Sequence, residues 1–138
     1  MLGEFFLCSE DGLEPPLIES GPEGRLPCVS AKGLTPVNIA SLGELLGAAG
    51  YEDVLGQCGN MHHESDGGEA GVWDVPAAVA RALSRSADLE PVAERWVETD
   101  ELRRDGWRKG DGLRVLTELS ELLAHQEQGQ ALWYWWSL

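Results

Sequence analysis

The sequence has few cysteines, and it contains no long apolar run. Cys8, Cys28 and Cys58 make an odd number with no paired spacing, which excludes the even disulfide framework of a small secreted protein. No apolar stretch approaches the length needed to span a bilayer. The segment Met1–Cys8 has no basic residue and too short an apolar run for a secretory signal, and Leu2 removes the glycine that myristoylation requires. We therefore expect a soluble cytoplasmic protein with reduced thiols and no membrane attachment.

Basic residues are scarce, and most of them lie in the second half of the chain. The formal net charge is −14, and residues 1–75 hold 13 acids against two bases, Arg25 and Lys32. Residues 76–138 hold 11 acids and eight bases. A negative field of this kind repels nucleic acid and anionic membranes, and it accelerates the encounter with a basic partner. An acidity that only keeps the protein soluble is the alternative interpretation.

The densest positive charge lies in residues 96–109. This segment holds four bases and two tryptophans, but four acids are interleaved with them. The acids cancel the bases, so we interpret the segment as a solvated, salt-bridged helix end and turn. We predict no nucleic-acid binding.

Familiar catalytic motifs are also missing. The sequence contains no Gly-x-Ser-x-Gly elbow, no phosphate-binding Gly-x-x-x-x-Gly-Lys-[Ser/Thr] loop and no Gly-x-Gly-x-x-Gly fingerprint. We predict no cofactor, and the absence of a catalytic motif favours a protein that is not an enzyme.

One segment, residues 58–66, does gather side chains that could carry chemistry. Cys58, His62 and His63 are candidate zinc ligands, with Glu64 and Asp66 close by, but no second ligand pair follows at a fixed spacing. A solvated loop that happens to hold two histidines is the simpler interpretation. A metal-dependent or thiol-dependent enzyme centred on this loop remains the alternative.

The length and the hydrophobic pattern predict one domain, residues 1–138, of the α+β class. We expect a small sheet that includes strands at residues 3–8 and 131–138, with a short strand at 28–31 and another ending at Val72-Trp73. The Pro- and Gly-rich residues 9–27 and the Gly-rich residues 56–71 are predicted to be loops.

About four helices are expected. Their boundaries follow from capping residues and from apolar spacing: residues 35–50 after Thr35, about 74–84 after Asp74, 88 to near 96 after Asp88, and about 112–128 after Asp111. Gly43 and Gly47 interrupt the first of these helices, and they suggest a close approach by another element.

The terminal segment predicts a strand that is covered on both sides. In an extended strand, Trp133 and Trp135 point to one face, whereas Tyr134 and Trp136 point to the other. Such a strand fits in a core beside the N-terminal strand. Alternatively, one of its faces is an interface, and the chain is a subunit of a larger assembly.

The layout of residues 72–138 resembles that of small uncharacterised bacterial proteins: a capped helix after Val72-Trp73-Asp74-Val75-Pro76, a helix ending near Trp96, and a long helix leading through Gln128-Gly129-Gln130 into an aromatic strand. In size and acidity the chain is similar to immunity proteins, which neutralise a toxin made by the same bacterium. This resemblance implies a binding function, and it transfers no site residues.

These observations predict a non-enzymatic acidic binding protein of the kind of an immunity-type inhibitor of a basic protein. Its oligomeric state is left open. The expected partner-binding residues are acids of the N-terminal half: Glu10, Asp11, Glu14, Glu52, Asp53, Glu64 and Asp66.

Overall fold

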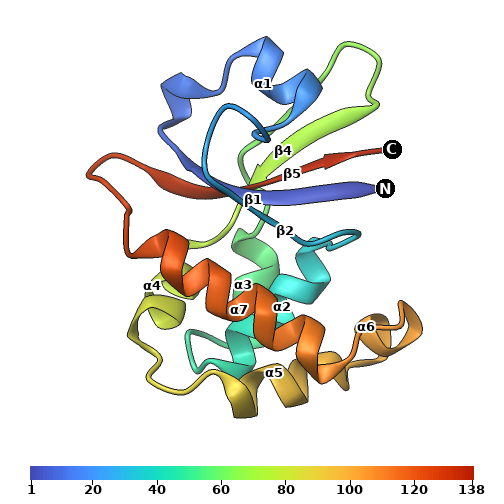
Figure 1. Cartoon of the computed structure of the whole chain (residues 1–138), viewed down its shortest axis with the longest axis vertical. Helices are drawn as coiled ribbons and strands as arrows, with labels where there is room; N and C mark the ends of the chain where they lie inside the picture. The colour runs from blue at the N-terminus through green and yellow to red at the C-terminus, as the bar shows by residue number, and fades with distance from the viewer.

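The fold is built around one antiparallel sheet whose centre is formed by the two ends of the chain (Figure 1). The structure is a computed structural model that describes all 138 residues. The two central strands pair from Leu2 opposite Ser137 to Cys8 opposite Ala131. In spatial order the five strands are β2 (Cys28–Ser30), β1 (Leu2–Cys8), β5 (Ala131–Ser137), β4 (Ala70–Asp74) and β3 (His62–Glu64).

The aromatic strand β5 supplies both faces of the core. Trp133 and Trp135 belong to one buried cluster, whereas Tyr134 belongs to the other and Trp136 packs against that second one. The buried indole N–H groups of both tryptophans have acceptors: Trp133 Nε1 donates to Cys8 O at 3.0 Å, and Trp135 Nε1 donates to Ile18 O at 2.7 Å. The predicted strand, covered on both sides and lying beside the N-terminal strand, is confirmed.

Six helices cover one side of the sheet, which we call the helix face (Figure 1). They enclose the larger apolar cluster, of 25 buried residues. Trp96, which is fully buried, donates its indole N–H to Asn38 O at 3.0 Å and so links α5 to α2. The helices are α2 (Pro36–Leu45), α3 (Tyr51–Gln57), α4 (Ala77–Arg85), α5 (Glu90–Val97), α6 (Asp100–Arg104) and α7 (Lys109–Leu123).

The opposite side, the α1 face, is covered by a thinner layer. The 3-10 turn η1 (Glu10–Gly12) and helix α1 (Pro15–Ser20) lie over the smaller cluster of eight buried residues. Leu17 and Ile18 provide the apolar side of α1. None of the helices on either face has both the length and the apolar character that crossing a membrane requires.

The α+β class is confirmed, but the number of helices is higher than expected. The structure has seven α-helices. The predicted loop 9–27 contains α1, the predicted loop 56–71 contains β3 and the start of β4, and α3 and α6 were not predicted. These elements are three to seven residues long. Segments of this length depend on tertiary packing for their stability, so their own sequences carry little periodic signal.

Helix boundaries also differ from the prediction. The first predicted helix is divided: α2 ends at Leu45, Gly47 adopts a left-handed φ of 73°, and Gly50 precedes α3. Helix α7 starts three residues earlier than expected, because Asp111 lies inside the first turn and accepts the Arg108 N–H at 2.8 Å. The predicted close approach is confirmed at Gly43, where an added Cβ would lie 2.8 Å from Val54 Cγ2. It is wrong at Gly47, where an added Cβ would meet nothing within 4 Å.

Candidate functional site

The three candidate metal ligands are not brought together. Cys58 is buried in the helix-face cluster. His62 and His63 are neighbours on β3, so their side chains point to opposite faces of the sheet. The ring of His63 lies 6.4 Å from that of Trp133, on the α1 face. No group of three or more His, Cys, Asp or Glu side chains is arranged to hold a metal ion.

The cysteines are also poorly suited to nucleophilic chemistry. Burial, and then the negative charge of Asp74, raises the pKa of Cys58 to about 12. Burial, and then a hydrogen bond to Glu4, raises the pKa of Cys28 to about 12, and burial raises the pKa of Cys8. Because the thiolate is the reactive form, these thiols are held in the unreactive state at neutral pH.

Glu4 is a buried acid that the sequence does not reveal. Its side chain lies on the α1 face of β1, the residue is 8% exposed, and Oε2 accepts the Cys28 Sγ–H at 3.0 Å. The short apolar segment around it predicts a strand and carries no sign that a carboxylate is enclosed there. This pair contributes to the local packing of β1 with β2.

The most distinctive surface feature is a group of eight acids around α1 and the β3–β4 hairpin, which we call the acidic surface. All eight are exposed, and none has a basic side chain within 4 Å. The two segments that supply them, residues 9–27 and 62–69, contain a single base, Arg25. The members are Glu10, Asp11, Glu14, Glu19, Glu23, Glu64, Asp66 and Glu69.

Two elements that are distant in the sequence create this surface. Helix α1 contacts both β3 and β4, so the hairpin stands beside it (Figure 1). Between them is a hollow of about 320 Å³, lined by Glu19 from α1 and by Asp66 and Glu69 from the hairpin. Carboxylates from both elements therefore face one depression.

The geometry of the hairpin turn explains why its acids are held close together. The Ser65 N–H donates to Ala70 O at 2.9 Å, and Ser65 Oγ accepts the Ala70 N–H at 3.2 Å. Gly68 has a left-handed φ of 68°, which glycine adopts without a steric cost. The glycines that predicted a loop thus form a tight turn between two strands.

The seven predicted partner residues are divided by the sheet. Glu10, Asp11, Glu14, Glu64 and Asp66 belong to the acidic surface, although the side chain of Glu64, next to His63 on the edge strand β3, points towards the helix face. Glu52 and Asp53 lie in the first turn of α3, in the layer of helices on the other side of the sheet. There they are near the positive end of a helix dipole, which is a local stabilising role. Sequence reasoning missed Glu19, Glu23 and Glu69. Of these, Glu19 and Glu69 share one hollow with Asp66, which only the tertiary structure brings about.

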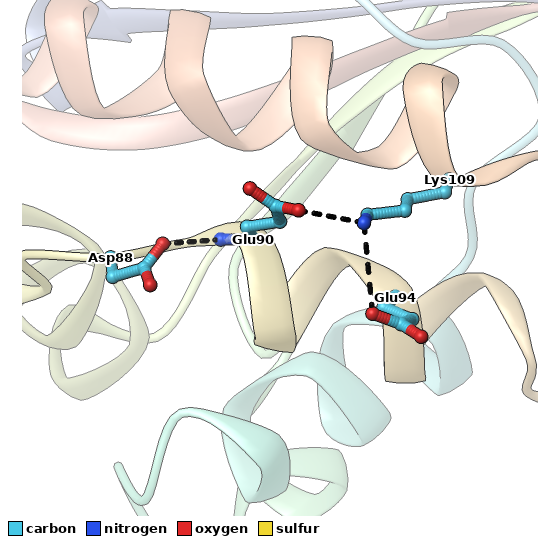
Figure 2. A network of polar contacts seen from close by, with 4 residues as sticks. All are labelled: Asp88, Glu90, Glu94 and Lys109. Carbon is cyan, nitrogen blue, oxygen red and sulfur yellow. Dashed lines mark hydrogen bonds and ion pairs between the residues drawn. The ribbon is translucent and has the colours of Figure 1, made fainter.

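The helix face differs in its charge balance. It carries eight of the ten bases, from Arg81 to Arg114, and all three ion pairs of the structure. Figure 2 shows Lys109 between Glu90, at 2.7 Å, and Glu94, at 3.7 Å. The expected salt bridges within residues 96–109 do not form, because Lys109 reaches back to α5. Mixed charges cover the helix face, and unpaired acids cover the acidic surface.

The fold defines this chain as an α+β protein with one antiparallel sheet and unequal layers on its two sides. The chain matches no protein-family model, no curated protein and no solved structure.

Proposed function

We propose that this chain is a non-enzymatic binding protein that presents its acidic surface to a basic protein, in the manner of an immunity-type inhibitor. The observation that carries the proposal is the segregation of charge in space. Eight exposed carboxylates without a base within 4 Å come from residues 10–23 and the β3–β4 hairpin, and three of them line one hollow, whereas most bases lie on the helix face.

Such a surface stores unfavourable electrostatic energy in the free protein. Like charges repel each other, and no ion pair within 4 Å relieves the repulsion. A partner with lysine or arginine side chains would relieve it, and the long-range field would steer the two proteins together. The hollow between Glu19 and the hairpin would accept one such side chain, because it is lined by three carboxylates.

The proposal places the protein in the cytoplasm, where reduced thiols persist. The three cysteines are free, which agrees with that location. A toxin-like reading frame beside the gene of this chain would identify the basic partner, and its product would be the protein to test first.

The experiment compares two variants with equal changes in net charge. The surface variant carries Glu10→Gln, Asp11→Asn, Glu14→Gln, Glu64→Gln and Asp66→Asn. The control carries five neutralised exposed acids from elsewhere: Glu52→Gln, Asp53→Asn, Glu98→Gln, Glu121→Gln and Glu127→Gln. The wild type and both variants are immobilised, and the basic protein that the wild type captures at low salt is identified. The rate at which this basic protein associates is then measured with each of the three immobilised proteins.

We expect the surface variant to associate at least about tenfold more slowly at low salt, with the control close to wild type. Raising the ionic strength should remove the difference, since screening weakens steering. The proposal fails if the wild type captures no basic protein, or if both variants lose binding equally.

A further inference from the structure

A second cavity lies away from the acidic surface, at the edge of the sheet formed by β2. It is an open cleft of about 680 Å³ between the turn that follows β2 and the turn that joins α6 to α7. This volume lies within the range typical of small-molecule sites. The groups that line the cleft determine which ligands would fit.

Two bases line the cleft, and one of them is firmly positioned. Arg114 donates from Nη1 to Glu118 Oε2 at 3.0 Å and from Nη2 to Ser30 O at 2.9 Å. A guanidinium has five N–H donors, so others stay free for a ligand. Lys32 is exposed and has no carboxylate within 4 Å. Both bases therefore have N–H donors that a carboxylate in the cleft could use.

Two acids line the same cleft. Asp105 is exposed and has no base within 4 Å. Asp111 accepts the Arg108 N–H with Oδ2, which leaves Oδ1 free. Neither acid pairs with Lys32 or Arg114, although all four line one cavity. No ion pair inside the cleft joins these four charges to one another, so a ligand that carries both charges could meet them.

An aromatic wall completes the cleft. Trp107 is partly buried, and its ring meets that of Trp96 edge-on, with centroids 5.5 Å apart. Two turns with left-handed glycines flank the cleft, Gly33 with a φ of 70° and Gly106 with a φ of 81°. An added Cβ at either glycine would meet nothing within 4 Å outside its chain neighbours, so neither turn is packed against another part of the molecule.

We propose that this cleft binds a free α-amino acid with an apolar or aromatic side chain. The ligand carboxylate meets Lys32 and Arg114, its ammonium group meets Asp105 and Asp111, and its side chain lies against Trp107. A simple anion fits less well, because the two acids would repel it. A simple cation has no reason to prefer this balanced cleft over the acidic surface.

The test is an NMR titration of the protein with L-phenylalanine and two analogues that each lack one charge. L-phenylalaninamide has no carboxylate, and N-acetyl-L-phenylalanine has no ammonium group. We expect L-phenylalanine to shift the backbone amides of residues 30–33 and 105–111, and each analogue to bind about tenfold more weakly, because each loses charge-assisted hydrogen bonds.

The variants Lys32→Gln and Asp105→Asn should also weaken the binding of L-phenylalanine, each by about tenfold. Both residues are exposed, so these variants are expected to fold. The matched control is Lys109→Gln, which removes a lysine that pairs outside the cleft and should leave binding unchanged. Absence of shifts at roughly 10 mM ligand, which corresponds to binding too weak to be specific, would overturn the proposal. So would equal binding of all three compounds, or shifts located elsewhere.

Discussion

The hydroxyl of Tyr134 occupies the space that a side chain at Gly3 would need. Tyr134 lies on β5, and Gly3 lies on the neighbouring strand β1. The absence of a Cβ at Gly3 lets the phenol ring pass and reach the loop after β2, where its hydroxyl donates to Ala31 O at 2.6 Å and accepts the Leu34 N–H at 3.0 Å. One buried side chain thus joins the central strand to the loop that leads into α2.

Removing this hydroxyl should destabilise the fold. Tyr134→Phe leaves a buried carbonyl and a buried amide without their partner, which costs about 1–3 kcal/mol. The free energy of unfolding, measured with urea, should fall by that amount. The control is Tyr51→Phe, because Tyr51 is only partly buried and its hydroxyl has no hydrogen-bond partner within the protein. Equal losses in the two variants would show that the bridge adds nothing.

Two glycines of α7 should respond in opposite ways to alanine. At Gly112, an added Cβ would lie 2.7 Å from Val97 Cγ1 and 3.3 Å from Ala93 O, so α5 must move away. At Gly110, it would meet nothing within 4 Å. Gly112→Ala should lower the melting temperature. Gly110→Ala should leave the melting temperature unchanged or raise it, with a gain of up to about 1 kcal/mol in the free energy of unfolding. A stabilising Gly112→Ala would contradict the close packing of α5 on α7.

Stability should decrease in alkaline solution. Burial raises the pKa of Cys58 from 9.0 to about 12, and burial raises that of Tyr134 from 10.0 to about 12. At pH values between the pKa of a group in the unfolded chain and its pKa in the folded protein, the unfolded chain releases a proton that the folded protein keeps. The stabilising contribution is therefore complete below about pH 9, and it is lost as the pH rises towards 12.

Urea denaturation at a series of pH values measures this effect. Cys58→Ala should make the decrease above about pH 9 shallower, because one of the retained protons is removed. Gln57→Ala, at the exposed neighbouring position, should leave the slope unchanged. An identical slope in Cys58→Ala and wild type would contradict the raised pKa of this thiol.

Purified protein without an affinity tag should contain no stoichiometric zinc. Cys58 is enclosed on the helix face while His63 faces Trp133 on the other side, so one ion cannot reach both. Zinc content measured by atomic emission should stay far below one ion per chain, before and after Cys58→Ala. Stoichiometric zinc that this substitution removes would revive the metal-dependent alternative.

The sequence predicted the long, regular elements well. The stripe of leucines in α7 and the alternating aromatics of β5 both reflect periodicities that a single segment carries. It also predicted the excess of acids in the first half. It failed for α1, α3, α6 and β3, which are short and contribute little pattern of their own.

The candidate sites were predictable only in part. Five acids of the acidic surface were expected, but their separation from Glu52 and Asp53 depends on which side of the sheet each helix occupies. Lys32 and Arg114 were not expected to share a cleft, because they are distant in the sequence. The Arg114–Ser30 hydrogen bond links α7 to the segment that holds Lys32.

The sequence by itself determined the fold class, the two terminal strands and the amount of negative charge, because composition and local periodicity are properties of the chain. Only the tertiary structure decided where that charge gathers and which side chains face one another. Contacts such as the one between Trp133 and Cys8, 125 residues apart, arise when the sheet brings the two ends together. No local sequence pattern encodes a contact between such distant residues, because the contact depends on how all the elements pack together.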